Sequence, residues 1–118
     1  MDKMPRSTKE AETFLRAMLP DTPEVTVRPM FGNLSAFVNG NMYTGVFGDD
    51  LFVRLSEKDT AELLKFKGAS SFEPMKGRAM KGYAVVPRAW KGDSAKVKPW
   101  VTKALDFTGK MPPKAKKG

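Results

Sequence analysis

The dipeptide Asn39-Gly40 is the feature that most constrains the fold of this chain. Asn-Gly is the preferred pair for a two-residue type I′ turn, because both turn residues must adopt a positive φ. Uncharged, largely apolar runs lie on both sides of it, at residues 34–38 and 42–47. The dipeptide therefore predicts an antiparallel hairpin. The lack of charge predicts that this hairpin lies in the centre of its sheet or is covered on both faces.

Two further strands are predicted to flank the hairpin. Residues 25–28 alternate in polarity and precede Pro29, which belongs at a strand end or on a sheet edge because it lacks a ladder donor. A turn that contains two aspartates leads into a fourth strand at residues 51–55. Alternation in that strand puts three aliphatic side chains on one face and Phe52 on the other. Four sequential strands with tight turns predict an antiparallel meander.

Two helices are predicted from capping motifs at their N-terminal ends. Ser7 and Glu10 have the spacing of a capping box for a helix over residues 7–19, and Ser56 stands in the same relation to Asp59 in a second helix. Glycine at position 68 is placed to end that second helix. A loop or irregular edge strand is expected at 72–82, followed by a short strand at 83–86.

A third helix is predicted near the end of the chain, capped by Asp93 or Ser94. Pro99 is tolerated in the first turn of a helix, so the regular part is expected to begin near Lys96. The apolar stripe of this helix has helical spacing and consists of Val97, Trp100, Val101, Ala104 and Leu105.

The order of these elements predicts an α+β fold with two layers. It consists of a helix, a four-strand meander, a helix, one or two strands and a helix, which gives an antiparallel sheet of about five to six strands with the helices packed on one face. Residues 1–109 are expected to form a single domain. Residues 110–118 are basic and lack apolar periodicity, so they are expected to be a disordered tail.

The 118 residues contain neither cysteine nor histidine. Disulfides and thiolate chemistry are therefore excluded, and the usual general base and transition-metal ligand are missing. The adjacent carboxylates Asp49 and Asp50 could serve Mg²⁺ or acid–base chemistry, but in a hairpin turn we expect them only to solvate the turn. We expect no enzyme activity, no metal, no cofactor and no small-molecule substrate. No apolar run approaches a membrane span, so we expect a soluble, cytoplasmic protein.

Positive charge is concentrated at the end of the chain. Residues 1–86 carry 12 Lys/Arg and 11 Asp/Glu, whereas residues 87–118 carry 9 and 2, within a total net charge of +8. Such asymmetry is typical of a nucleic-acid surface or of a solubilising tail, and both interpretations stay open. Under the first, lysine–phosphate contacts are weak, salt-sensitive and independent of base sequence. The predicted contacts are Lys96, Lys98, Lys103, Lys110, Lys114, Lys116 and Lys117.

A sheet with helices on one face needs cover on its other face. Phe52 points to that second face, and Phe37 and Phe47 are expected to join it. An open apolar patch usually marks an interface. These three phenylalanines are therefore the predicted contact residues for a protein partner or for a homodimer.

Several segments resemble the N-terminal domain of the TfoX/Sxy competence regulators. They are VRPMFG at 27–32, FVNGNM at 37–42, DLFVRL at 50–55, FEPM at 72–75 and MKGYAVVP at 80–87, with a final helix that contains Trp100. The resemblance covers roughly residues 11–107. Residues 32–33 are Gly-Asn, where the family often has two glycines.

The resemblance implies a two-layer α+β domain in a bacterial, cytoplasmic, non-enzymatic protein tied to transcriptional control of DNA uptake. Full-length regulators of this kind carry a second, C-terminal domain, and we expect none in these 118 residues. Two function classes therefore stay open. One is a regulatory or protein-interaction module, and the other is a basic accessory protein that binds nucleic acid weakly through the last helix and the tail.

Overall fold

The computed structural model describes residues 6–20, 22–30, 32–73, 77 and 80–112. Its elements confirm the predicted α+β class and are α1 (Lys9–Met18), β1 (Val25–Met30), β2 (Asn33–Val38), β3 (Asn41–Phe47), β4 (Asp50–Arg54), α2 (Glu57–Leu64), β5 (Ser70–Ser71), β6 (Tyr83–Val85), a 3₁₀ turn η1 (Arg88–Trp90) and α3 (Ser94–Gly109).

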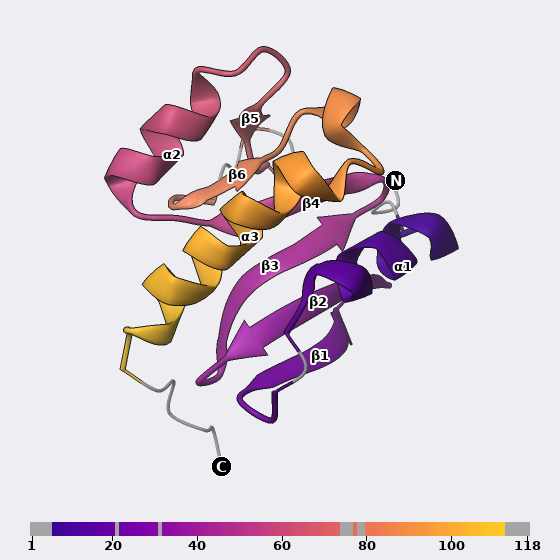
Figure 1. Ribbon diagram of the computed structural model, residues 1–118, viewed down its shortest axis with the longest axis vertical. Helices are drawn as coiled ribbons and strands as arrows, with labels where there is room; N and C mark the ends of the chain where they lie inside the picture. The colour runs from indigo at the N-terminus through magenta and orange to yellow at the C-terminus, as the bar shows by residue number, and fades with distance from the viewer. Residues whose placement is uncertain (1–5, 21, 31, 74–76, 78–79, 113–118) are drawn as a thin grey trace.

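The six strands form one antiparallel sheet in the order β1-β2-β3-β4-β6-β5 (Figure 1). The meander runs through β4, and β6 pairs with β4 before the two-residue strand β5 closes the far edge. β1 is the other edge strand and carries Pro29, as its missing donor requires. The four-strand meander and the sheet of five to six strands are both confirmed.

The central hairpin has the predicted turn. Val38 pairs with Asn41 across a two-residue loop, in which Asn39 has a φ of 54° and Gly40 a φ of 77°. Both values are positive, as a type I′ turn demands. Every residue of β2 is buried, which confirms that this uncharged hairpin is covered on both faces.

One face of the sheet carries the main core. α1 and α3 both lie across it, and α2 lies beside β6 and adds Leu63 to the same core (Figure 1). The helices contribute apolar side chains that are buried against the strands. From α1 and α3 these side chains are Ala11, Leu15, Met18, Val97, Val101 and Ala104.

A β-bulge in β3 changes which side chains reach this core. Ala36 pairs with Thr44 and Phe37 pairs with Met42, so Tyr43 is the extra residue of the bulge. Tyr43 is fully buried in the main core, and its hydroxyl has no hydrogen-bond partner among the described residues. Burial raises the pKa of Tyr43 to about 12, because the charged phenolate is disfavoured there.

The second face of the sheet has a smaller aromatic core. Phe52 stacks on Phe72 with ring centroids 4.3 Å apart, and Tyr83 completes the cluster. Gly45 makes room for this stack, because a Cβ at that position would lie 2.7 Å from Cζ of Phe52. The segment that contains Phe72 thus folds back over the sheet and supplies cover that no helix provides.

The start of α1 differs from the prediction. Thr8 caps the helix by accepting a hydrogen bond from the Ala11 amide at 3.1 Å. The hydroxyl of Ser7 instead accepts from the Leu34 amide at 3.3 Å and donates to Glu12. The predicted Ser7 cap is wrong because a tertiary contact with β2 engages that hydroxyl.

The second helix begins as predicted, with Ser56 accepting a hydrogen bond from the Asp59 amide at 3.1 Å. α2 nevertheless ends at Leu64, earlier than Gly68 suggested. Gly68 has a φ of 94° and turns the chain toward β5.

Asp93 caps α3, which confirms one of the two predicted caps, and the helix begins at Ser94. Pro99 therefore lies in the second turn. The prediction that puts Pro99 in the first turn, with the regular helix beginning near Lys96, is wrong. Pro99 removes only the hydrogen bond to the exposed Ala95, and the buried stripe on the other side of the helix offsets that loss.

Candidate functional site

The lysines predicted to contact nucleic acid fall into two groups. Lys96, Lys98 and Lys103 lie on α3 and Lys110 is its C-cap, and all four are exposed. None of the four forms an ion pair with another described residue. Lys114, Lys116 and Lys117 lie outside the described residues, as does most of the predicted tail.

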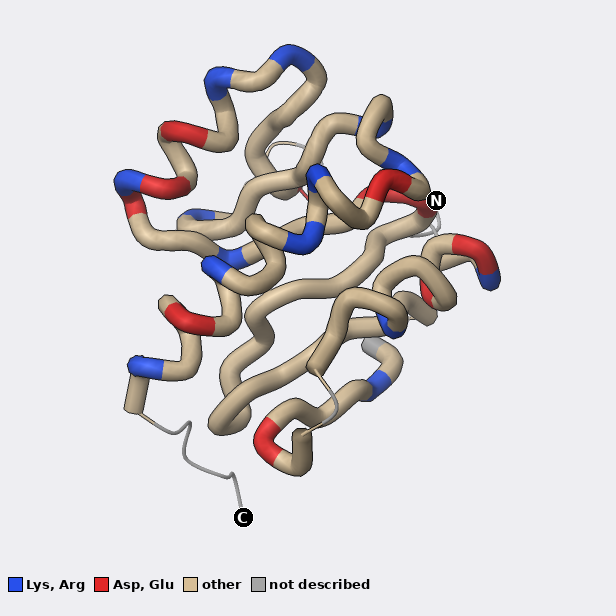
Figure 2. The backbone as a smooth tube through the Cα atoms, viewed as in Figure 1, with Lys and Arg blue, Asp and Glu red and all other residues tan. Residues whose placement is uncertain are grey.

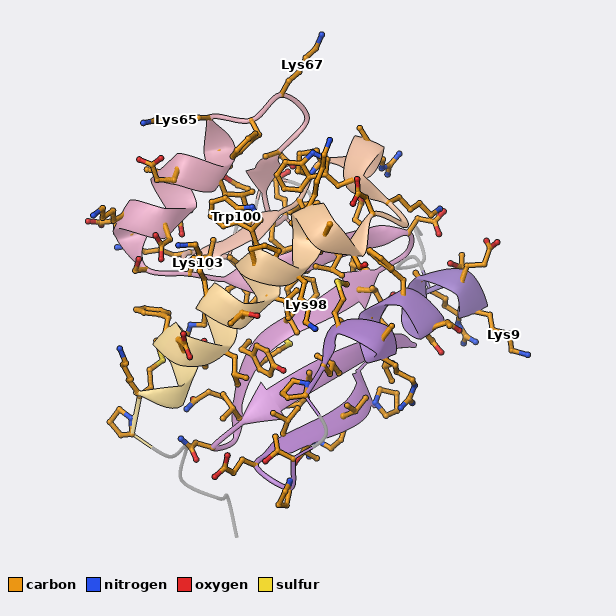
Figure 3. All side chains as sticks on the ribbon, in the orientation of Figure 1. Lys9, Lys65, Lys67, Lys98, Trp100 and Lys103 are labelled. Carbon is orange, nitrogen blue, oxygen red and sulfur yellow. The ribbon has the colours of Figure 1, made fainter. Side chains whose placement is uncertain are left out.

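Helix geometry aligns most of the described group along one line. Lys96, Trp100, Lys103, Phe107 and Lys110 recur at intervals of three and four, so they share one side of α3; we call this line the α3 stripe. Figure 3 shows Trp100 and Lys103 on the side of the helix toward α2, and Lys98 on the side toward α1. Lys98 is therefore separated from the other predicted contacts.

An aromatic cluster lies where α2 and η1 approach α3. The Phe66 ring meets the Trp90 ring edge to face at 5.0 Å between centroids, and the Trp100 ring at 6.1 Å. Nζ of Lys103 lies 5.8 Å from the centroid of Trp100, within the range of a cation–π contact. Trp90 and Trp100 are the only tryptophans of the chain.

Lysines surround this cluster. Lys65 and Lys67 flank Phe66 in the sequence and extend outward from the end of α2 (Figure 3). We call the combined feature the α2–α3 surface, and its residues are Lys65, Phe66, Lys67, Trp90, Lys96, Trp100 and Lys103.

The α2–α3 surface is also where apolar side chains are exposed. Phe66 is 47% exposed and Leu64 is 39% exposed, and among the described residues they are the only large hydrophobic side chains in that class. Trp90 and Trp100 are half-buried against the main core. Adjacent exposed apolar side chains on an otherwise well-packed domain mark an interaction site.

The charge on this side of the molecule is mainly, but not only, positive. α2 carries its acidic residues before its C-terminal end, and positive charge follows at Lys65 and Lys67 (Figure 2). Glu62 pairs with Lys65 at 3.3 Å, and Asp93 and Asp106 flank the α3 stripe. Lys67, Lys96 and Lys103 keep their charge without a described acidic partner.

Sequence reasoning identified Lys96 and Lys103 but missed the aromatic half of this surface. Phe66 reads as one more apolar residue of a helix, and Trp90 lies in the unpredicted turn η1. The available signal was the Lys-Phe-Lys run at 65–67, in which an aromatic side chain between two charges falls at the end of a helix.

A second group of charged residues surrounds the turn between β3 and β4. Arg88 holds Asp50 with two hydrogen bonds of 2.7 and 3.2 Å, and Lys91 lies 3.3 Å from Asp49. The Thr8 hydroxyl donates to Asp49 at 2.8 Å. We call Thr8, Asp49, Asp50, Arg88 and Lys91 the turn cluster. The two carboxylates thus do more than solvate the turn, because they connect it to η1 and to the start of α1.

The turn cluster borders a cleft of about 290 Å³ between α1, η1 and α3. Its floor is apolar and includes Phe14, Leu51 and Trp90. The hydrogen bond from Thr8 and the neighbouring Lys91 hold the pKa of Asp49 below its ordinary value, and the hydrogen bond to Asp50 raises the pKa of Arg88. A carboxylate held ionised by such partners is a poor proton donor near neutral pH.

Metal ligation finds no support in the described part of the chain. No three residues among His, Cys, Asp and Glu are grouped there in a way that could hold a metal ion. Each carboxylate of the turn cluster already has a cationic partner.

The phenylalanines predicted as an interface lie on the second face, but the chain itself covers two of them. Phe37 is 7% and Phe52 is 3% exposed, and Phe47 is half-buried beside Phe72 with ring centroids 5.4 Å apart. Arg28 additionally lies over the Phe37 ring at 4.5 Å. The open patch expected here is closed by these contacts, and a partner interface at these residues stays a prediction.

The end of α3 packs against the central hairpin. The Asn39 side chain donates to the Gly109 carbonyl at 3.1 Å, and the Asn41 side chain donates to the Pro112 carbonyl at 3.1 Å.

Within the described ranges, no helix has the length and apolar character that a membrane crossing needs.

A comparison with protein families matches residues 17–108 to the family described as the TfoX N-terminal domain. The match spans all six strands, α2, η1 and nearly all of α3. It includes the whole α2–α3 surface and most of the turn cluster. No curated protein matches this chain.

Proposed function

The chain belongs to the TfoX N-terminal domain family, and on that premise we propose that it is a non-catalytic regulatory module in the transcriptional control of competence. It works in the cytoplasm by binding a macromolecular partner. It needs no metal or cofactor, and it converts no small-molecule substrate.

The α2–α3 surface is the observation that carries this proposal. It joins the exposed Phe66 to two half-buried tryptophans and to Lys67, Lys96 and Lys103, which have no described acidic partner. Aromatic side chains are enriched at recognition surfaces, and an exposed apolar side chain beside them marks such a surface. The second face of the sheet is a weaker candidate for docking, because Phe37 and Phe52 are already covered.

The turn cluster supports a binding role over a catalytic one. Its carboxylates are the most enclosed acidic groups beside the cleft, yet Arg88 and Lys91 neutralise them. A catalytic acid or base usually has a pKa shifted toward neutrality. The pKa of Asp49 is shifted the other way.

The test compares variants in the bacterium that encodes the chain, after removal of its own copy. We expect the wild type and Lys9→Gln, an exposed change on α1, to restore transcripts of the DNA-uptake genes. The double variant Leu64→Ser/Phe66→Ser should stay folded by circular dichroism and fail to restore them. Full restoration by the double variant would show that the α2–α3 surface is not the working surface.

A homodimer is one occupant that this experiment leaves open, because a second copy of the chain could also bury Leu64 and Phe66. Sedimentation of the wild type over a range of concentrations addresses it. A dimer that the double variant fails to form identifies a second copy as the partner. A monomer at every concentration assigns the surface to another molecule.

A second candidate function is weak binding of nucleic acid by the last helix. The observation that favours it is the α3 stripe, in which Lys96, Lys103 and Lys110 are aligned with Trp100. A salt titration of oligonucleotide binding tests it, with the full chain and with a variant that carries glutamine at all three positions. Equal, negligible binding by both chains at low salt would exclude this function.

A further inference from the structure

We propose that the α2–α3 surface binds single-stranded nucleic acid, with a base stacked on Phe66, the tryptophans supporting that ring, and phosphates held by Lys67 and Lys103. This inference rests on the second candidate function and goes beyond it. Lysine–phosphate contacts alone do not distinguish a single strand from a duplex, whereas aromatic stacking does.

The first step of the argument is the geometry of the aromatic rings. Phe66 is nearly half exposed, and its ring stands edge to face on both Trp90 and Trp100, with interplanar angles of 71° and 80°. The tryptophans are packed against the main core and support the Phe66 ring from behind. A ring that is held in place on one side and open on the other is a stacking platform for a base.

The second step is the position of the cations. Lys65 and Lys67 flank Phe66 in the sequence, and Lys103 lies over the Trp100 ring, so positive charge borders both Phe66 and Trp100. Lys96 and Lys110 continue the charge in both directions along α3. With a rise of about 1.5 Å per residue, the three lysines of the α3 stripe span roughly 21 Å, which is long enough to follow several nucleotides.

The third step is the choice between a single strand and a duplex. The bases of a duplex are stacked on one another, so an aromatic side chain can stack on them only by wedging them apart. The rings of the α2–α3 surface come from the turn that follows α2, from η1 and from α3. These elements lie near one another in the ribbon (Figure 1). Unpaired bases can reach the rings of this surface without any such deformation.

The tryptophans supply a direct readout, because both belong to this surface. The experiment titrates the full chain with an oligothymidylate of about 12 nucleotides and with a mixed-sequence duplex of equal length at low salt. We expect the single strand to quench tryptophan fluorescence and to bind at least about 10-fold more tightly than the duplex.

Variants at Phe66 separate stacking from general apolar contact. Phe66→Ser should weaken single-strand binding by about 10-fold, and Phe66→Tyr should retain it, because tyrosine keeps a stacking face. Phe66→Leu is the matched comparison, since leucine keeps an apolar side chain at this exposed position but offers no ring. It should weaken binding as much as Phe66→Ser, and full affinity in Phe66→Leu would show that apolar contact, not stacking, is what the strand needs. Circular dichroism verifies that each variant is folded.

Two results would overturn the inference, and they differ in what they leave standing. Equal affinity for strand and duplex without quenching removes the stacking mode and leaves only phosphate binding by the α3 stripe. Absence of binding to either oligonucleotide removes the nucleic-acid function as well. The surface would then belong to a protein partner, and the proposed regulatory role would stand on its own test.

Discussion

The turn cluster and the α2–α3 surface are both rich in charge, but they use it differently. In the turn cluster each carboxylate forms an ion pair with a cationic side chain: Asp50 with Arg88, and Asp49 with Lys91. On the α2–α3 surface, Lys103 lies over the Trp100 ring, and Lys67 and Lys96 are exposed to solvent. Paired charges connect elements of the fold, whereas unpaired cations beside exposed rings are available to a ligand.

The two regions also share η1, which makes their difference informative. Arg88 and Lys91 turn toward the aspartates, while Trp90 packs against Phe66. A short 3₁₀ turn therefore serves both regions. A change in the turn cluster should mainly alter stability, and a change on the α2–α3 surface should mainly alter binding.

The largest expected effect comes from reversing the charge of the α3 stripe. Changing Lys96, Lys103 and Lys110 to glutamate should lower the affinity for single-stranded oligonucleotide by about 100-fold or more, because phosphate contacts become repulsive. The Tm should change little, since none of the three has a described ion pair. Fluorescence titration and thermal melting measure the two quantities.

The matched control for this variant reverses Lys9, Lys58 and Lys81, which are exposed lysines elsewhere on the domain. The control has the same net charge but should retain most of the affinity. An equal loss in both triple variants would mean that overall charge, not the α3 stripe, drives the binding.

The second-largest expected effect is on the salt dependence of oligonucleotide binding, and it distinguishes an unpaired lysine from a paired one. Lys103→Gln should lower the slope of log affinity against log salt by about 0.7 for a single strand, because one phosphate contact is lost. Lys91→Gln should leave the slope unchanged, since Lys91 is paired with Asp49 in the turn cluster. Identical slopes for both variants would remove the distinction between the two regions.

A smaller effect is expected on stability from the turn cluster. Asp50→Asn breaks the two-bond contact with Arg88 and should lower the Tm by about 1–4 °C, with no change in oligonucleotide affinity. Asp106→Asn is the control, because Asp106 is an exposed acid with no ion pair in the described structure. It should leave the Tm unchanged. A loss of affinity in Asp50→Asn would show that the two regions are coupled.

The smallest effect concerns acid pH. The pKa of Asp49 is lower in the folded chain than its ordinary value of 3.8, so Asp49 stabilises the fold above that pH. This contribution should disappear as the pH falls through the folded pKa. Urea unfolding of the wild type and Asp49→Asn should therefore differ near neutral pH and converge at strongly acid pH. A difference that persists in acid would assign the stabilisation to a cause other than the charge.

The local features of the fold were predictable because neighbouring residues specify them. Asn39-Gly40 has two positive φ values, which this pair of residues favours, and Ser56 caps the helix that follows it. Alternation placed the aliphatic side chains of β4 on one face and Phe52 on the other. Each of these outcomes depends on steric and hydrogen-bonding preferences within a few residues.

The errors arose where distant segments compete for one group. Ser7 matched a capping box, but the Leu34 amide engages its hydroxyl and Thr8 becomes the cap. Pro99 is acceptable in the second turn of α3 because the buried side of that helix packs against the sheet. Neither contact can be predicted from rules that consider only neighbouring residues.

The same distinction applies to the candidate site. The lysines of α3 and their excess positive charge are visible in the order of residues, because helical periodicity aligns Lys96 with Lys103. The meeting of Phe66, Trp90 and Trp100 is not visible there, since three separate elements bring them together. Their contact depends on how α2 and η1 pack beside α3, and such packing is a balance of burial over the whole domain rather than a preference of any short segment.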